Sequence, residues 1–216
     1  MHQGVDKAVV ADLAAALART SVELTIGQKR DLAFEDEHDV DQEAYLEMVA
    51  GKTAALLRCA TYGGAVLATD GSRRGAEEAL AAMGEFGMRL GLAFQVRDDI
   101  LGIWGAEDET GKPSGSDIRR RKKSLPIIFA FHAVPETAFD RLSALYSQDD
   151  ELTPADEGYV RGVLDAFAFA QSQAKEQLEH ALSALGRVAG HPETVRSNRF
   201  LAQLAELADF VTYRRF

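Results

Sequence analysis

Two adjacent carboxylates, Asp98 and Asp99, lie in an otherwise apolar stretch and give the first indication of chemistry. Two ionised carboxylates side by side repel each other unless a cation lies between them, and oxygen ligands of this kind suit a hard cation such as Mg²⁺. Gln95 precedes them by three and four residues, so that the three side chains share one face of a helix. Most Asp-Asp pairs are simply hydrated, but the apolar neighbours Phe94 and Ile100 favour a functional pair.

A glycine-rich loop and a run of basic residues follow the acidic pair. Residues 105–116 read as a loop because glycine and proline interrupt them, and glycine lets backbone amides approach an anion closely. Residues 119–123 are all basic, in a chain whose formal net charge is −10. Lysines can hold the phosphate that a bound cation also bridges. This combination suggests a site for a metal–diphosphate complex, and a solvated basic turn is the alternative.

Lys52 is a third basic candidate because it lies on the apolar stripe of a predicted helix over residues 42–69. It follows Met48 by four residues and precedes Leu56 by four. A lysine on a buried face must extend its ammonium group to solvent or meet an anion, because an unpaired buried charge is costly. Extension to solvent is the simpler reading of this residue alone, and pairing with an anion is the other.

The elements that must position these residues are all helical. Apolar residues recur at helical spacing along the chain, and the region around the acidic pair lacks the alternation of a strand. Gln28, Asp31 and Glu35 share one face and read as a solvated polar stripe. The predicted helices cover residues 5–19, 21–34, 42–69, 73–104, 126–133, 136–146, 160–185 and 191–211. We therefore predict an all-α protein in which residues 1–216 form a single domain.

Composition narrows the function classes. A net charge of −10 over 216 residues lacks the basic footprint of a nucleic-acid-binding protein. The one cysteine, Cys59, excludes an intrachain disulfide and fits a reducing cytosol. The first residues do not read as a signal peptide, and no apolar run is long enough to span a membrane. We expect a cytoplasmic protein without a membrane span and without a nucleic-acid partner.

The motifs, in this order and spacing, resemble the trans-isoprenyl diphosphate synthases (polyprenyl synthetases). These are all-helical enzymes that condense isopentenyl diphosphate with an allylic diphosphate. Each motif is weak by itself, whereas the ordered set is specific and extends over most of the chain. The matching segments are Gly27-Gln28-x-x-Asp31, Lys52-Thr53, Phe94-Gln95-x-x-Asp98-Asp99, Gly111-Lys112-x-x-Gly115-x-Asp117 and Lys122-x-Ser124-Leu125-Pro126.

The resemblance implies roles for these residues and a magnesium-dependent prenyl transfer. Asp98 and Asp99 correspond to the family's second aspartate-rich motif and would bind Mg²⁺. The lysines would hold the allylic diphosphate, and residues 105–123 would form a lid over it. The implied catalytic residues are Lys52, Asp98, Asp99 and Lys112. The implied substrate-binding residues are Thr53, which would line the path of the hydrocarbon tail, Gln95, Lys112 and Lys122.

Two departures from the family pattern bear on activity. Gly102 stands where the second aspartate-rich motif has its third acid, and the first aspartate-rich motif is not found before Gln28. We therefore expect the C-terminal two-thirds of the family fold, weakly active or inactive alone, whether the chain is a genuine truncation or begins at an internal methionine. A noncatalytic subunit that pairs with a catalytic chain is the alternative, and a class I terpene cyclase is less favoured. A homodimer, usual in the family, is the expected assembly.

Overall fold

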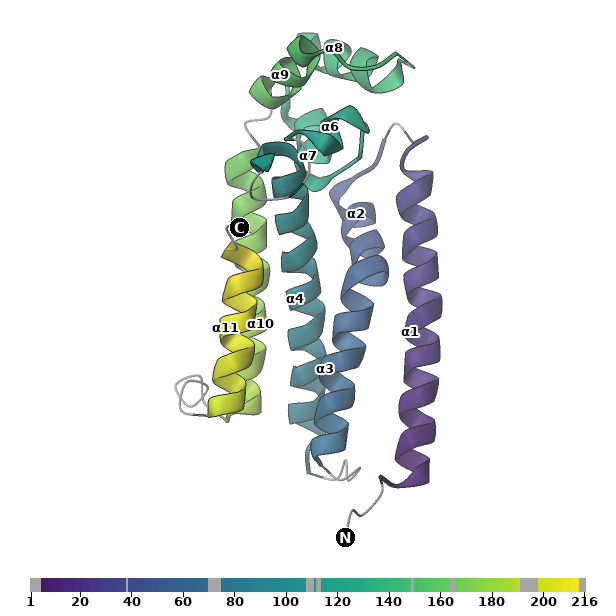
Figure 1. Cartoon of the computed structure of the whole chain (residues 1–216), viewed down its shortest axis with the longest axis vertical. Coiled ribbons are helices and arrows are strands. Elements are labelled where there is room, and N and C mark those ends of the chain that lie inside the picture. Colours follow the sequence, from purple (N-terminus) through teal and green to yellow (C-terminus); the bar gives the residue numbers. More distant parts are fainter. Residues whose placement is uncertain are drawn as a thin grey trace.

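The computed structural model describes residues 5–37, 39–69, 75–107, 111, 114–148, 150–163, 166–190 and 198–213. Every regular element within these ranges is a helix, so the predicted all-α class is confirmed. Long helices run side by side along the long axis, and four short helices gather at one end (Figure 1). The elements are α1 (Lys7–Ala33), α2 (Gln42–Val49), the π-helix η1 (Ala50–Ala54), α3 (Ala55–Ala68), α4 (Glu77–Trp104), α6 (Ser116–Arg119), α7 (Leu125–Ala133), α8 (Glu136–Ser147), α9 (Pro154–Val163), α10 (Phe167–Val188) and α11 (Arg199–Tyr213).

Helix α1 is continuous where the sequence predicts two helices, 5–19 and 21–34. The hydroxyl of Ser21 donates to the carbonyl oxygen of Leu17, one turn earlier, at 3.0 Å. This bond satisfies the side chain inside the helix, so the polar Thr20-Ser21 pair does not end it. The helix packs against its neighbours on one side and has only two buried residues among its 27, Thr20 and Gly27.

The predicted helix over residues 42–69 is found as α2, η1 and α3, which follow one another without a break. The wider π-helical turn contains Lys52 and Thr53, and such bulges are frequent at functional sites. Gly27 on α1 lies directly against this turn, because a β-carbon at position 27 would overlap the backbone nitrogen of Lys52. Glycine is therefore required where α1 meets η1, and this contact places Lys52 beside the last turns of α1.

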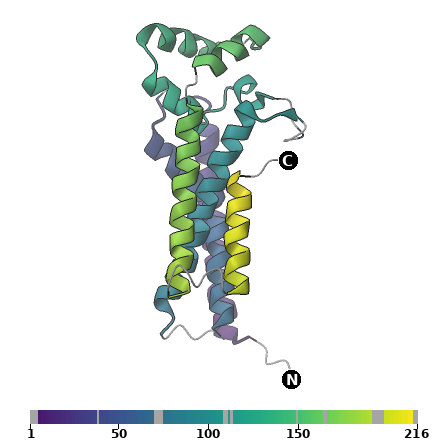
Figure 2. The same cartoon turned by 90° about the vertical axis from the view of Figure 1, so that its left-hand side faces the viewer.

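Helix α4 is the central element. It packs against α3 and η1 on one side and against α10 and α11 on the other (Figures 1 and 2). Leu92, Val96 and Ile100 of α4 belong to a buried cluster that also contains Tyr45 of α2 and Leu125 of α7. The last two turns of α4 carry the predicted acidic pair to the end where the short helices gather.

The C-terminal half differs from the prediction in how its helices are divided. The predicted helix over 160–185 is two elements, α9, which ends at Val163, and α10, which begins at Phe167. Trp104 packs edge-on against Phe167, with ring centroids 5.1 Å apart, and so holds the start of α10 against the end of α4. The predicted start of the last helix, at residue 191, lies outside the described residues. No helix in the described ranges has the length and apolarity needed to cross a membrane.

Candidate active site

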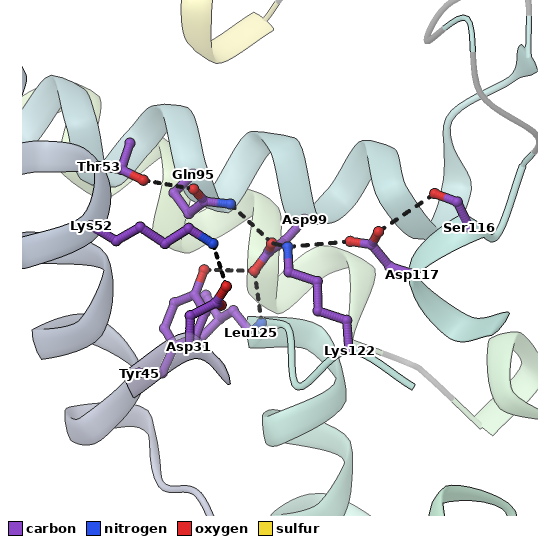
Figure 3. Close-up of polar contacts among 10 residues, drawn as sticks. All are labelled: Asp31, Tyr45, Lys52, Thr53, Gln95, Asp99, Ser116, Asp117, Lys122 and Leu125. Atoms are coloured by element: carbon purple, nitrogen blue, oxygen red, sulfur yellow. Dashed lines mark hydrogen bonds and ion pairs between the residues drawn. The ribbon is translucent and has the colours of Figure 1, made fainter. Parts of the chain in front are cut away.

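Side chains singled out by the sequence converge at one end of α4. Figure 3 shows Lys52 and Thr53 from η1, Gln95 and Asp99 from α4, and Lys122 from the segment before α7 in one region, with Thr53 joined to Gln95, Gln95 and Lys122 joined to Asp99, and Lys52 joined to Asp31. Asp98 is half-buried in the same turn of α4 as Asp99. Lys112 lies outside the described residues, so its predicted role stays a prediction.

Asp99 is the centre of this arrangement and has a side chain that is 0% exposed. Its Oδ2 accepts hydrogen bonds from the hydroxyl of Tyr45 at 2.6 Å and from the backbone N–H of Leu125 at 3.0 Å. Its Oδ1 accepts from the ammonium group of Lys122 at 2.7 Å and from the amide of Gln95 at 3.3 Å. An ionised carboxylate has about four acceptor positions. These four donors therefore occupy the carboxylate of Asp99.

Gln95 and Thr53 extend the network from α4 to η1. The hydroxyl of Thr53 donates to Oε1 of Gln95 at 2.9 Å. Accepting this bond with its oxygen leaves Gln95 with its NH₂ group directed at Asp99. The orientation of the amide of Gln95 is therefore determined from both ends.

Lys122 lies between two carboxylates. Besides its contact with Asp99, its ammonium group is 3.4 Å from Oδ2 of Asp117. Burial by itself would lower the pKa of Lys122, but Asp99 and Asp117 more than offset that effect and raise the pKa above its usual value. Burial raises the pKa of Asp117, with Lys122 opposing it and Asp99 adding to it. Lys122 is thus held as a cation, with a side chain still 26% exposed.

The structure explains why position 102 is a glycine, although the family pattern has an acid there. A β-carbon at position 102 would fall inside van der Waals contact of the carboxylate of Asp117. The absence of a side chain on α4 at this point lets Asp117 lie against the helix and reach Lys122. Asp117 is the last residue of the Gly111-Lys112-x-x-Gly115-x-Asp117 motif, but the sequence analysis assigned it no role.

Lys52 forms an ion pair with Asp31 of α1. Of the two outcomes considered for this lysine, pairing with an anion is the one found. The reading of Asp31 as part of a solvated stripe is wrong, because its side chain is only 20% exposed and contacts Lys52. The pair is possible because Gly27 allows α1 to approach η1 so closely.

The basic run does not act as one cluster. Arg119 forms an ion pair with Glu157 of α9 at 2.8 Å, and Arg121 donates to the carbonyl oxygen of Leu145 at 2.8 Å. Lys123 donates to the carbonyl oxygen of Glu37 at 2.9 Å. Of these contacts, only that of Lys122 belongs to the network around Asp99, and the contacts of Arg119, Arg121 and Lys123 hold neighbouring segments in place.

Tyr45 is a site residue that sequence reasoning missed, since it was taken only as part of an apolar stripe. Burial raises the pKa of Tyr45 well above its usual value, and the nearby charge of Asp99 raises it further. The phenol therefore stays protonated and donates to Asp99. A buried tyrosine normally needs a hydrogen-bond partner for its hydroxyl. The place of Tyr45 on an apolar stripe was therefore the one sign in the sequence that it would have a polar partner.

The charge of the site suits a divalent cation together with an anion. Four carboxylates (Asp31, Asp98, Asp99 and Asp117) face two ammonium groups (Lys52 and Lys122) among the described residues. No group of three or more metal-binding side chains is arranged around a common point in those residues. Mg²⁺ commonly keeps several waters and is held by one or two carboxylates plus substrate phosphates. The half-buried Asp98 fits that kind of binding.

Comparison with known proteins agrees with the motifs. The polyprenyl synthetase family model matches residues 2–159. The chain is 37% identical over 201 residues to the geranylgeranyl diphosphate synthase of Mycobacterium tuberculosis, covering 91% of this chain and 54% of that protein. It therefore spans about half the length of this curated relative.

Solved structures show the same likeness. The geranylgeranyl pyrophosphate synthetase of Pyrococcus horikoshii superposes with a TM-score of 0.83 at 28% identity, over 99% of this chain and 62% of that one. The geranylgeranyl pyrophosphate synthase of Corynebacterium glutamicum, in a complex with isoprenyl diphosphate and magnesium, superposes with a TM-score of 0.78 at 25% identity, over 98% and 58% of the two chains. These matches confirm the predicted isoprenoid-synthase type of helical fold.

Proposed function

Because the chain belongs to the polyprenyl synthetase family, we propose that it serves prenyl transfer, the condensation of isopentenyl diphosphate with an allylic diphosphate. In this proposal Lys52 and Lys122 hold the allylic diphosphate, and Asp98 contacts the Mg²⁺ that accompanies it. Lys112 would hold the same diphosphate, as its motif implies. Thr53, at the boundary between the network and the helical interior, would line the path of the hydrocarbon tail.

The observation that carries the proposal is the convergence of Lys52, Asp99 and Lys122 from three separate segments. Lys52 comes from η1, Asp99 from α4 and Lys122 from the segment before α7 (Figure 3). An excess of carboxylates repels a free diphosphate, so an anion of this kind binds here with a cation rather than alone. The arrangement therefore favours a metal–diphosphate complex over a simple phosphate ligand.

The chemistry follows from where charge develops. When the allylic C–O bond ionises, negative charge builds on the departing diphosphate, and the ammonium groups of Lys52 and Lys122 stabilise it. Because the carboxylates hold these cations in place beforehand, the site does not have to reorganise during the reaction. Mg²⁺, when bound, supplies further positive charge to the leaving group.

The activity of these 216 residues by themselves is part of the proposal, because they span about half the length of the curated relative. We expect weak turnover or none from them alone. The test is incorporation of radiolabelled isopentenyl diphosphate into an allylic primer with Mg²⁺, using Lys52→Met as the inactive control. Turnover well above that control would contradict the proposed inactivity and support the prenyl transfer itself.

A noncatalytic subunit is the second candidate, favoured by the one-sided packing of α1. In that role the chain would pair with a longer, catalytic member of the family, whereas a homodimer would join two copies of this chain. Pyrophosphate binding separates the first candidate from the second, because a subunit that has no catalytic role does not need the lysines. A class I terpene cyclase would instead release cyclic hydrocarbons from the allylic diphosphate alone.

A further inference from the structure

Arg121 is the one residue other than glycine that has a positive φ among the described residues. Its φ is 51°, in the left-handed region where the β-carbon of an L-residue crowds its own backbone. Glycine is the usual residue in this region because it has no β-carbon. An arginine at this position must therefore be stabilised by its surroundings.

The left-handed conformation of Arg121 closes the end of α6. The N–H of Arg121 donates to the carbonyl oxygen of Ile118 at 2.8 Å. The next N–H, that of Lys122, donates to the carbonyl oxygen of Asp117 at 2.9 Å. With Arg120 as the C-cap of α6, these two bonds make a Schellman motif, whose left-handed residue is most often glycine. In this chain Arg121 has that position, and Lys122 follows it directly.

The side chain of Arg121 binds the end of α8. Its Nε donates to the carbonyl oxygen of Leu145, in the last turn of α8, at 2.8 Å. Its Nη2 donates to the carbonyl oxygen of Asp150, just beyond that helix. Carbonyl oxygens at the C-terminal end of a helix favour a cation, and the fork of a guanidinium group can serve two acceptors. These bonds offset the cost of the left-handed conformation and join α8 to the residue before Lys122.

The place of the Lys122 ammonium group depends on this turn. The group lies 2.7 Å from Asp99 and 3.4 Å from Asp117, so a different backbone conformation at the residue before it would move it out of reach. The next residue, Lys123, is held elsewhere, because its ammonium group donates to the carbonyl oxygen of Glu37 at 2.9 Å. The two neighbouring lysines therefore reach different segments directly after the left-handed residue.

We propose that Arg121 is a positioning residue for Lys122: by binding the end of α8, its guanidinium group holds the left-handed turn that brings the ammonium group of Lys122 to Asp99. The proposal rests on the function proposed above, in which Lys122 holds the diphosphate. The end of α8 thereby helps to set the affinity of the anion site. Glycine at position 121 should replace arginine for anion binding, because glycine adopts the left-handed conformation without such bonds, whereas alanine does not.

The test compares Arg121→Ala with Arg121→Gly, both of which lose the guanidinium group. The probe is inorganic pyrophosphate in the presence of Mg²⁺, followed by calorimetry. Arg121→Ala should raise the Kd about tenfold, because nothing then offsets the left-handed conformation, whereas Arg121→Gly should stay within about threefold of the unaltered chain. Arg187→Ala, at an exposed ion pair with Glu85, controls for the lost positive charge and should leave the Kd unchanged. An unchanged Kd for Arg121→Ala, or an equal rise for both variants, would overturn the proposal.

A double variant shows whether Arg121 acts through Lys122. In a chain that already has Lys122→Gln, Arg121→Ala should raise the Kd by less than about threefold more, whereas a further rise of about tenfold would contradict the proposal.

If the unaltered chain binds no pyrophosphate, the proposed function fails, and hydrogen exchange then judges the positioning role. The amide of Lys122, whose bond to Asp117 closes the turn, reports on the left-handed conformation. Its protection should fall about tenfold in Arg121→Ala and be retained in Arg121→Gly. Equal protection in the two variants would overturn the positioning role.

Discussion

Gly102 lies directly against Asp117, because the carboxylate of Asp117 fills the space that a side chain at position 102 would need. The two residues are on α4 and α6, and the contact brings the loop motif against the acidic helix. In the sequence, glycine at position 102 looks like the loss of a metal ligand. In the structure, the missing side chain leaves the space in which Asp117 reaches Lys122.

Substitution of Gly102 by alanine should displace Asp117 and loosen Lys122. We expect a loss of about 1–3 kcal/mol in the free energy of unfolding from overpacking, and a higher Kd for pyrophosphate. The control is Gly64→Ala on α3, where a β-carbon meets no atom within 4 Å. That variant should gain up to about 1 kcal/mol, because alanine is a better helix former than glycine. Denaturant titrations of both variants decide the matter, and equal behaviour would contradict the assignment.

The charge of Lys122 should stabilise the protein up to strongly alkaline pH. The pKa of Lys122 in the folded chain lies above the ordinary value of 10.5, so the folded state holds this proton more tightly than the unfolded state. The stabilisation is complete below pH 10.5 and is lost as the pH rises through the folded-state pKa.

Melting curves of the unaltered chain and of Lys122→Gln at several pH values measure this contribution. The difference in melting temperature should be constant from about pH 7 to 9 and should shrink above about pH 10.5. Lys175→Gln is the matched control, because Lys175 and its partner Glu179 are both 63% exposed and such pairs contribute little. A difference for Lys122→Gln that already shrinks near neutral pH would show that the two carboxylates do not hold its charge.

Helix α9 should restrain the loop motif through Glu157. Glu157 pairs with Arg119 of α6 at 2.8 Å, and Arg161 of the same helix donates to the hydroxyl of Ser114 at 3.2 Å. Glu157→Gln removes the ion pair, and we expect about tenfold faster hydrogen exchange of the α6 amides, as for a loss of roughly 1.4 kcal/mol. The α6 amides include the N–H of Arg119, which bonds the carbonyl oxygen of Gly115. Glu179→Gln, at an exposed pair on α10, should leave them unchanged.

The outer side of α1 should be an interface. Val10 and Leu17 lie one heptad apart on this helix, and each is 51% exposed. If two copies pair through this side, Leu17→Asp should shift the species seen by light scattering from dimer to monomer at micromolar concentration. Phe139→Asp, at an exposed apolar residue of α8, should have no such effect. A clean monomer for the unaltered chain would contradict the homodimer.

The spacing of apolar residues predicted the helical class, and the spacing of Gln95, Asp98 and Asp99 predicted that they share one side of α4, because residues three and four apart on a helix share a face whatever the rest of the chain does. The partners of Asp99 were not predictable in this way. Tyr45 and Leu125 are separated from it by 54 and 26 residues, and only the packing of α2 and α7 against α4 brings them together. The ion pair of Lys52 depends in the same manner on Gly27, a residue 25 positions earlier that lies against the backbone of Lys52. No local sequence pattern predicts this contact.

The one-sided packing of α1 also has a bearing on regulation. This helix supplies Asp31 to Lys52 and rests on the π-helical turn through Gly27. A protein that bound the exposed side of α1 would therefore rest on the same helix that places Asp31 against Lys52. Assembly and anion binding would then depend on one shared element.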